Sequence, residues 1–318
     1  MTSRDRFSFE SPVSTSLDEL VQLRSAANAM QRRVRRKSAA PMNGASVSRR
    51  LGRGLDFSEV REYQPGDDVR MIDWKVTART GRAQTKLFIE ERERPVLLVV
   101  DNTASMRFGT RGMYKSMMAA RLAALLGWSA IANQDRVGGF VFTDESHREV
   151  RPQAGRRGLM SLFRAIQECQ SQTGFSDKHP FADTLSRLRQ GAHGGSTVVI
   201  LSDFNQFDEQ ARSSLGSILQ TLDVVAVQIN DPLEVELPSK GRFSFRSAIE
   251  GHQKRFTLDM GSRQQRLRYQ DRFLKRQSEL KTLFGAGRHY FTSALTNDPL
   301  LDTSARIVSR QQPLTGVS

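Results

Sequence analysis

The sequence has a single cysteine, Cys169, in 318 residues. A disulfide within the chain needs two cysteines and a thiolate zinc cluster needs several, so neither can be built from this chain. Secreted disulfide scaffolds and cysteine-ligated zinc folds are therefore excluded. The scarcity of cysteine also favours a reducing compartment, and we expect a cytoplasmic protein.

The sequence also lacks a long apolar run. The nearest approach, residues 113–132, is interrupted by Lys115 and Arg121 and is followed by Asn133. It predicts an amphipathic helix of a globular domain rather than a membrane span. Residues 1–19 do not combine a basic segment with an apolar one and a small-residue cleavage site, so no secretory signal is expected.

The motifs of several enzyme classes are missing as well. No Gly-x-Ser-x-Gly elbow occurs and the five histidines form no motif, which argues against a serine hydrolase. Gly109, followed by Tyr114-Lys115-Ser116, imitates a phosphate loop, but a tyrosine stands where the cradle of backbone N–H groups needs a glycine. Asp101 has no second acid two residues on, as a phosphoryl-transfer aspartate would. We therefore expect a protein that is not an enzyme.

Positive charge is present in excess. The chain has 48 lysines and arginines against 34 aspartates and glutamates, for a net charge of +14. Such a balance attracts nucleic acid and anionic membranes non-specifically. The densest basic cluster, residues 32–37, ends a predicted helix over residues 17–37 and contains no interleaved aromatic residue. Nucleic-acid binding is therefore an alternative and not the leading interpretation.

The core of the chain shows strands that alternate with helices. At 38% hydrophobic residues, the chain can form a substantial core. Strands are expected at residues 96–100, 137–142, 197–201, 224–229 and 289–292. Helices are expected at residues 113–133, 158–169, 182–190, 209–222 and 262–283. This alternation predicts an α/β fold with a doubly wound, mostly parallel sheet flanked by helices.

The composition also predicts a division into domains. Residues 38–54 are rich in Pro, Gly and Ser, which is typical of a linker, and residues 243–249 with 255–258 look like a hairpin. The predicted parts are a basic N-terminal helix in residues 1–37, the linker 38–54, a β-rich appendage from 55–94 and 231–260, a core from 95–230 and 261–309, and a tail, 310–318.

Polar side chains follow two of the predicted strands. Asp101, Thr103 and Ser105 follow the first core strand at alternate positions, and Asp203 follows the third. In open α/β sheets, ligands bind at the carboxyl ends of the strands. Hard cations such as Mg²⁺ or Mn²⁺ prefer oxygen ligands, so the four residues predict a metal site. The alternative is that these residues only cap helices and turns.

The spacing resembles the metal-ion-dependent adhesion site of von Willebrand factor A-type domains. The pattern of that site is Asp-x-Ser-x-Ser, then a Thr, then an Asp, and here Thr103 replaces the first serine. The resemblance implies that Thr103 and Ser105 ligate the metal directly, while Asp101 and Asp203 orient waters. It also implies that an acidic side chain of a partner supplies a remaining ligand, because a site poor in direct carboxylates stays electropositive.

The third element of that pattern is weaker in this sequence. A Gly-Thr pair normally opens a helix there, whereas this chain has Pro-Phe-Ala-Asp-Thr-Leu over residues 180–185. Either Thr184 or Asp183 could fall at the metal, and we favour Thr184. Asp183 in that position would tighten metal binding but weaken the attraction for an acidic partner.

A longer resemblance lies upstream. The run GLDFSEVREYQPGDDVRMIDWK over residues 54–75, followed by Ala78-Arg79-Thr80, is similar to the signature of a bacterial domain-of-unknown-function family, number fifty-eight. Asp231-Pro232-Leu233-Glu234 and Leu237-Pro238 match its later part. The resemblance spans residues 38–259 and implies a von Willebrand factor A-like core. It further implies an accessory role beside a MoxR-type AAA+ ATPase, with that ATPase or its client as the partner.

These observations lead to one functional hypothesis and two alternatives. We expect a non-catalytic protein-interaction module with an adhesion-type metal site. The alternatives are a metal-dependent hydrolase, for which the same carboxylates would activate water, and a basic nucleic-acid binder. Within the signature, Tyr63 and Trp74 look like anchors with polar tips, so we favour a structural role for this segment over a functional surface.

Overall fold

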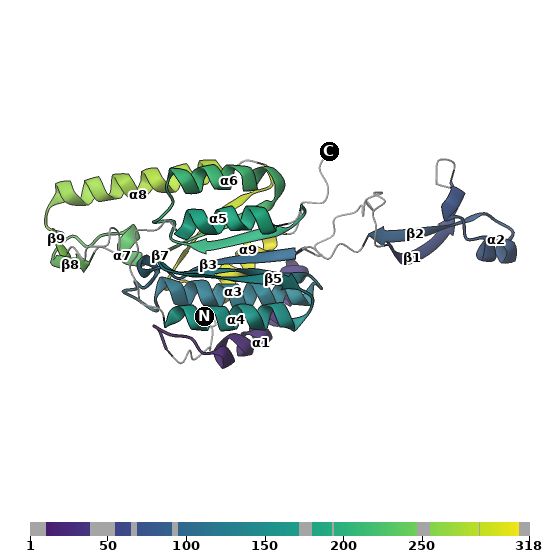
Figure 1. Ribbon diagram of the computed structural model, residues 1–318, viewed down its shortest axis with the longest axis horizontal. Helices are drawn as coiled ribbons and strands as arrows, with labels where there is room; N and C mark the ends of the chain where they lie inside the picture. Colours follow the sequence, from purple (N-terminus) through teal and green to yellow (C-terminus); the bar gives the residue numbers. More distant parts are fainter. Residues whose placement is uncertain are drawn as a thin grey trace. The chain divides into compact units, whose positions relative to one another are not determined.

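The structure is a computed structural model that describes residues 11–38, 55–64, 69–90, 95–171, 180–192, 194–246, 255–285 and 287–311. The chain forms two compact units. The larger comprises Met1–Pro41 and Arg94–Pro313, and the smaller comprises Met42–Glu93 and Leu314–Ser318. Figure 1 shows the six-stranded sheet of the larger unit between layers of helices.

The sheet has the strand order β10-β7-β6-β3-β4-β5. Its strands are β3 (Pro95–Asp101), β4 (Arg136–Phe142), β5 (His147–Gln153), β6 (Thr197–Ser202), β7 (Asp223–Asn230) and β10 (Tyr290–Leu295). All neighbours are parallel except the edge pair β4 and β5. The chain moves outward from β3 on one side and then outward from β6 on the other, which is the order of a doubly wound sheet. The predicted α/β fold, with a doubly wound and mostly parallel sheet flanked by helices, is confirmed.

β3 shows why an unbroken apolar run makes a central strand. Val96, Leu98 and Val100 belong to one buried cluster, whereas Leu97 and Val99 belong to a second cluster. Successive side chains of a strand point to opposite faces of the sheet, so a strand that is covered on both faces must be apolar throughout.

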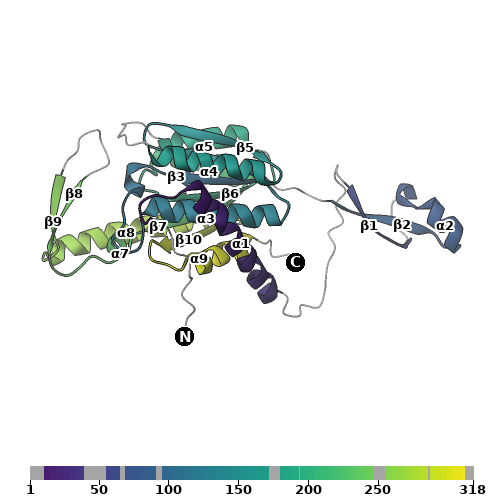
Figure 2. The ribbon, with the colours of Figure 1, turned by 90° about the horizontal axis from the view of Figure 1, so that it is seen from below.

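Helices cover both faces of the sheet (Figures 1 and 2). The first cluster includes residues of α1 (Leu17–Ser38), α3 (Lys115–Ala132), α4 (Arg156–Gln170) and α9 (Leu300–Gln311). The second cluster includes residues of α5 (Pro180–Gly191), α6 (Glu209–Thr221) and α8 (Arg263–Phe284). The helix α9 and the polar edge strand β5 are absent from the sequence-based predictions.

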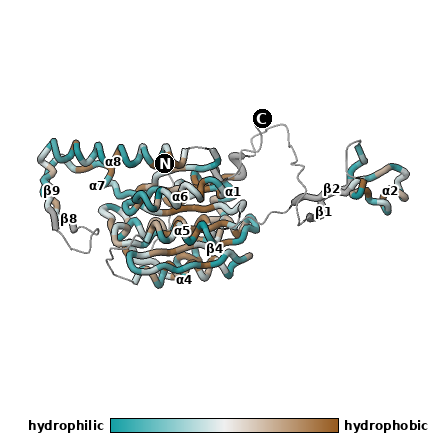
Figure 3. Tube along the Cα trace, turned by 45° about the horizontal axis from the view of Figure 1, so that its top comes forward, coloured by the Kyte–Doolittle hydropathy of each residue, from teal (hydrophilic) through white to brown (hydrophobic). Residues whose placement is uncertain are grey.

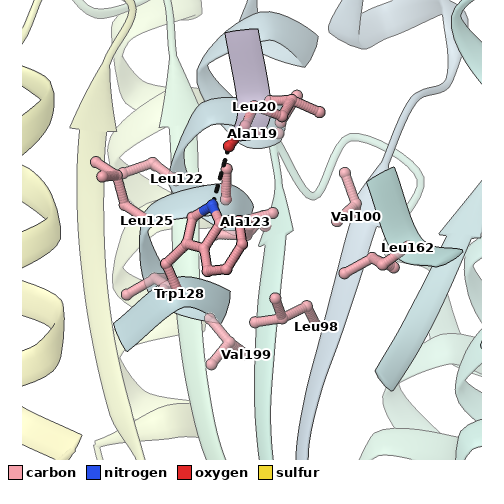
Figure 4. Close-up of a cluster of buried hydrophobic side chains, with 14 of the residues drawn as sticks. Leu20, Leu98, Val100, Ala119, Leu122, Ala123, Leu125, Trp128, Leu162 and Val199 are labelled. Atoms are coloured by element: carbon pink, nitrogen blue, oxygen red, sulfur yellow. Dashed lines mark hydrogen bonds between the residues drawn. The ribbon is translucent and has the colours of Figure 1, made fainter. Parts of the chain in front are cut away.

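The N-terminal helix α1 is part of the core. Leu20, Leu23 and Met30 are almost completely buried, and the indole Nε1 of Trp128 donates a hydrogen bond of 3.0 Å to the carbonyl oxygen of Leu20 (Figure 4). On sequence alone, residues 1–37 are a basic segment separate from the core. The structure differs because the apolar stripe of the helix packs on α3 and α9, while Arg32 and Arg33 are exposed.

Helix α3 is buried along almost its whole length, which explains its nearly continuous apolar sequence. Its two charged side chains are both paired. Arg121 Nε donates to Glu19 Oε1 of α1 at 2.6 Å, and Lys115 belongs to the site described below. Within the described residues, no helix is long and apolar enough to span a membrane.

The smaller unit contains an antiparallel pair, β1 (Leu55–Glu62) and β2 (Gln84–Glu90), with η1 (Val69–Met71) and α2 (Trp74–Thr80) between them. Asp73 caps α2 by accepting hydrogen bonds from the backbone N–H groups of Lys75 and Val76. The side chain of Trp74 is 67% exposed, so it is not buried within its own unit, and its expected role as an anchor stays a prediction. As the first residue of a short helix, it lies on the surface.

The second hairpin is separate from the first. β8 (Arg242–Arg246) and β9 (Arg255–Asp259) form their own two-stranded sheet, which belongs to the larger unit. The sequence-based division instead joins residues 55–94 and 231–260 into one appendage. Both segments have the local pattern of a hairpin, and that pattern contains no information about which body of the protein a hairpin joins.

Candidate metal site

The predicted carboxylates lie on adjacent strands at the switch point of the sheet. β3 and β6 are parallel neighbours, with Val100 beside Leu201. Asp101 ends β3 and Asp203 directly follows β6. The chain continues from β3 into α3 on one face and from β6 into α6 on the other. In doubly wound sheets, this divergence of loops is where ligands bind.

Asp101 is buried and holds its loop in place. Its Oδ1 accepts hydrogen bonds from the backbone N and the Oγ1 of Thr103, at 2.9 and 2.7 Å. Its Oδ2 accepts one from Ser202 Oγ at 2.6 Å. Within the described residues it forms no ion pair. Burial, reinforced by the negative charge of Asp203, raises the pKa of Asp101 to about 7.

Two hydroxyls, those of Thr103 and Ser105, lie close to this carboxylate. Thr103 Oγ1 and Ser105 Oγ are 3.2 Å apart, and the Ser105 side chain helps to lower the pKa of Asp203. Thr103 is fully buried, whereas Ser105 is half-buried. The structure therefore brings Asp101, Thr103, Ser105 and Asp203 together at the ends of two neighbouring strands.

The oxygen atoms fit a small divalent cation. Mg²⁺ binds its ligands at about 2.1 Å in an octahedron, so neighbouring ligand atoms lie about 3 Å apart. The separations from Asp101 Oδ1 to Thr103 Oγ1 and from Thr103 Oγ1 to Ser105 Oγ are 2.7 and 3.2 Å. The described residues contain no cluster of three or more His, Cys, Asp or Glu suited to a metal. A cation here would therefore depend on hydroxyls and water, as Mg²⁺ and Mn²⁺ tolerate.

A buried lysine stands beside the second carboxylate. Lys115 Nζ donates hydrogen bonds to Asp203 Oδ2 at 2.8 Å and to Glu234 Oε1 at 2.7 Å, and it lies 5.8 Å from the ring centre of Phe108. Burial acts to lower the pKa of Lys115, but the two carboxylates outweigh it and the pKa is raised. Burial likewise acts to raise the pKa of Asp203, yet Lys115 holds it below its usual value. Asp203 is therefore kept ionised.

The position of Glu234 follows from a short helix, α7 (Pro232–Val235). Asp231 Oδ1 accepts from the backbone N of Leu233 at 2.9 Å, and Glu234 Oε2 accepts from the backbone N of Asp231 at 2.8 Å. This capping box holds Glu234 at the helix start, with its other oxygen on Lys115. The order Asp-Pro-Leu-Glu thus suits a helix start, with the capping aspartate first and the capping glutamate three residues later.

Two further polar side chains fix the loops around the site. Asp144 Oδ2 accepts from the backbone N of Ala104 at 2.7 Å, and its Oδ1 accepts from Gln206 Nε2 at 3.0 Å. Asp144 therefore links the loop after β3 to the loop after β6. Asn205 donates to both oxygens of Asp203, from its backbone N at 2.8 Å and from Nδ2 at 2.7 Å.

The fifth predicted ligand does not join this network. Thr184 lies one turn into α5 and is buried, but its hydroxyl donates to the carbonyl oxygen of Pro180 at 2.7 Å. Asp183 is exposed. Among the described residues, no hydrogen bond connects Thr184 or Asp183 with the four oxygen donors. The choice between the two thus stays a prediction.

Sequence reasoning missed Lys115, Glu234, Asp144 and Ser202. The signal for Lys115 was a cation in the first turn of an otherwise apolar helix, and the signal for Ser202 and Asp144 was a polar residue at or just after a strand end. Glu234 stands in a segment that matches the family signature, but nothing local indicated its contact with Lys115, which joins residues 119 positions apart.

The comparison with known families identifies the chain. The model of the family described as "Protein of unknown function DUF58" matches residues 59–279. The chain belongs to the DUF58 family. An uncharacterized protein of Mycobacterium bovis is 28% identical over 296 residues, which are 92% of this chain and 90% of that protein. An uncharacterized protein of Mycobacterium tuberculosis matches to the same extent. The uncharacterized protein YeaD of Bacillus subtilis is 39% identical over 51 residues, 16% of this chain and 13% of its own.

Solved structures resemble the DUF58 chain at low identity. An aerotolerance-related membrane protein from Bacteroides fragilis has a TM-score of 0.44 at 11% identity and covers 69% of this chain and 98% of its own. BatB from Bacteroides thetaiotaomicron has a TM-score of 0.40 at 9% identity, with the same coverages. A von Willebrand factor type A protein from Catenulispora acidiphila has a TM-score of 0.40 at 14% identity. The match covers 72% of this chain and 44% of that protein. None of these likenesses assigns an activity to the chain.

Proposed function

We propose that this DUF58 protein is a non-catalytic protein-interaction module that holds Mg²⁺ or Mn²⁺ and uses it to capture an acidic side chain of a partner. The observation that carries the proposal is the convergence of hydroxyl and carboxylate oxygens at the ends of the neighbouring strands β3 and β6, where Asp101, Thr103 and Ser105 lie in contact and Asp203 follows β6. Hydroxyl and carboxylate oxygens at these separations suit a hard cation.

The charges around the site support a cation close to Asp101. Lys115 forms ion pairs with Asp203 and Glu234. In the described structure, Asp101 accepts hydrogen bonds only from uncharged donors, two hydroxyls and a backbone N–H. A bound divalent cation would supply the missing positive charge and an open coordination position for a carboxylate. Because Ser105 is half-buried while Thr103 is fully buried, an external carboxylate would approach from the side of Ser105.

The identity of the partner is proposed from the family resemblance. We place this protein beside a MoxR-type AAA+ ATPase, with the ATPase or its client presenting the acidic side chain. The single cysteine, Cys169, is buried and free, which is compatible with a reducing, cytoplasmic compartment.

A hydrolytic role finds little support in these contacts. A general base must accept a proton from water, but the oxygens of Asp101 are occupied by Thr103 and Ser202 and those of Asp203 by Lys115 and Asn205. Within the described structure, neither carboxylate has an oxygen without a hydrogen-bond donor. A protein-binding role is therefore preferred over metal-dependent hydrolysis.

Calorimetric titration with Mg²⁺ and Mn²⁺ tests the proposal. The wild-type protein should bind one cation per chain, and Asp101→Ala should abolish binding. Thr103→Val, which removes only the hydroxyl, should weaken it in a variant that keeps the wild-type circular dichroism. Asp271→Ala, which removes an exposed carboxylate of α8, is the matched control and should bind as the wild type does. Absence of binding to the wild-type protein, or equal binding to all variants, would refute the metal site.

A further inference from the structure

Helix α8 is attached to the core mainly through its last turns. Leu280 and Phe284 are buried in the second cluster, whereas most residues before Leu280 are exposed or half-buried. Figure 1 shows the helix extending beyond α6 toward the β8–β9 hairpin, and the tube in Figure 3 is mostly hydrophilic along it. A long face of this helix is therefore not covered by the described residues of the larger unit.

Two leucines lie on that uncovered face. Leu267 is 55% exposed and Leu274 is 54% exposed. They are seven residues apart, which is two helical turns, so they lie on one line along the helix. A single exposed leucine needs no explanation, but a pair in one line on an otherwise polar helix is the arrangement that receives a partner helix.

A row of positive charge runs beside the leucines. Arg268 and Lys275 each directly follow a leucine and are also seven residues apart, and Arg263 and Arg272 extend the basic surface. All four are exposed, and none forms an ion pair with another described residue. Asp271 is the one acidic residue between the two rows. The face is thus apolar along one line and strongly basic along the next.

This charge pattern selects the occupant. A second copy of the chain would bring another basic face, since the chain has a net charge of +14, so self-association through α8 is disfavoured. An amphipathic helix that binds a membrane buries a broad apolar face, and two leucines separated by Asp271 do not provide one. An acidic helix with leucines at heptad spacing matches both rows.

The buried side of α8 holds this face in a fixed orientation next to the proposed metal site. Arg276 donates hydrogen bonds to Asn205 Oδ1 at 2.7 Å and to the carbonyl oxygen of Phe204, and Asn205 in turn donates to Asp203. A preformed helix needs little ordering when it binds, which favours affinity.

We propose that the exposed face of α8, with Leu267 and Leu274 beside Arg268 and Lys275, is a docking surface for an acidic, leucine-bearing helix of a partner protein. The surface goes beyond the metal site, because none of its contacts requires a bound cation. The effect of mutating this surface and the effect of removing the metal can therefore be measured separately.

The test uses the full chain and a fluorescein-labelled acidic peptide of about three heptads, with leucines at heptad spacing and flanking glutamates. Fluorescence anisotropy should show binding to the wild-type protein and at least about tenfold weaker binding of a peptide with the same residues scrambled. Leu267→Ser/Leu274→Ser and Arg268→Glu/Lys275→Glu should each weaken binding about tenfold or more. These side chains are exposed, so the variants should keep the wild-type melting temperature.

Matched controls separate a specific surface from general charge attraction. Val13→Ser removes another half-exposed apolar residue, and Arg156→Glu/Arg157→Glu reverses two exposed charges on α4. Both should bind the peptide within about twofold of the wild type. Equal loss in the α4 double variant, no effect of the leucine variant, or no peptide binding at all would overturn the proposal.

Two further outcomes identify the occupant and the dependence on metal. If the wild-type protein binds phosphatidylserine vesicles in a leucine-dependent way but not the peptide, the occupant is a membrane and the proposal is wrong. Peptide binding should be the same in EDTA and in Asp101→Asn, so failure of the metal site leaves this result unchanged. Loss of peptide binding in EDTA would contradict an independent surface.

Discussion

The ammonium nitrogen of Lys115 lies 2.8 Å from Oδ2 of Asp203, and the two side chains are 1% and 2% exposed. The same ammonium lies 2.7 Å from Oε1 of Glu234. Removing such charges from water costs several kcal/mol per ion unless they remain paired. The ammonium group of Lys115 therefore provides the cation for Asp203 and Glu234. Asp101 has no such cation among the described residues.

Replacement of Lys115 by Met should destabilise the protein strongly. It leaves the buried Asp203 and the partly buried Glu234 without their cation, and breaking a buried pair in this way costs about 3–5 kcal/mol. Urea denaturation in EDTA measures the loss. The additional substitution Glu234→Gln removes one of the unpaired charges, so Lys115→Met/Glu234→Gln should recover part of the stability. A midpoint for Lys115→Met equal to that of the wild type would contradict the role of this lysine.

The stability of the metal-free protein should depend on the ionisation of Asp101. Burial and the charge of Asp203 raise its folded-state pKa to about 7, from 3.8. A raised pKa means that the folded protein favours the protonated form, so the stability from this group is complete below about pH 4 and is lost as the pH rises through 7. Asp101→Asn stays neutral and should not show this loss.

Urea titrations in EDTA at pH values between about 4 and 8 check this sign. The unfolding free energy of the wild type should fall relative to that of Asp101→Asn as the pH rises, and the other titrating groups cancel in the comparison. Saturating Mg²⁺ should remove the difference, because a cation stabilises the ionised carboxylate. Parallel pH profiles in EDTA would rule out a raised pKa at Asp101.

Truncation of Leu23 tests whether α1 belongs to the core. Leu23 is 2% exposed in the first buried cluster, and Leu→Ala at such a site costs about 2–5 kcal/mol. Leu23→Ala should therefore lower the melting temperature by several degrees. Val13→Ala, at a side chain that is 50% exposed, should change it little. If the two variants have the same melting temperature, the helix does not contribute to the core.

Cys169 should react slowly with thiol reagents in the folded protein. Its side chain is buried, and burial raises the pKa of the thiol to about 11, so very little reactive thiolate is present at pH 8. A colorimetric thiol assay should show one group that reacts quickly in urea and slowly in buffer. Cys169→Ala serves as the blank. Fast reaction of the native protein would show that this part of α4 opens readily.

Much of the fold and four of the site residues could be predicted because their signals are local. Val96 to Val100 is an unbroken run of β-branched and apolar residues, and only a strand covered on both faces needs one. Asp101, Thr103 and Ser105 are identifiable because they directly follow that run. Their convergence with Asp203 follows from the adjacency of β3 and β6.

The features that could not be predicted depend on contacts between residues far apart in the sequence, or on segments without a regular pattern of apolar and polar residues. β5 has the sequence His-Arg-Glu-Val-Arg-Pro-Gln, and an edge strand with so much exposed surface does not show an apolar pattern. The pairing of Lys115 with Glu234 requires the fold to bring α3 and α7 together. The exposure of Trp74 depends on what surrounds its helix, which the sequence of a seven-residue helix does not reveal.

The packing of α1 also constrains how the protein can be synthesised. α1 is made near the beginning of the chain, yet it packs against α9, which ends at Gln311, and Arg33 of the first pairs with Asp302 of the second at 3.4 Å. The apolar stripe of α1 therefore leaves the ribosome long before its final cover exists. Because exposed apolar surface makes nascent chains prone to aggregate, a chain cut before α9 should depend on chaperones to stay in solution.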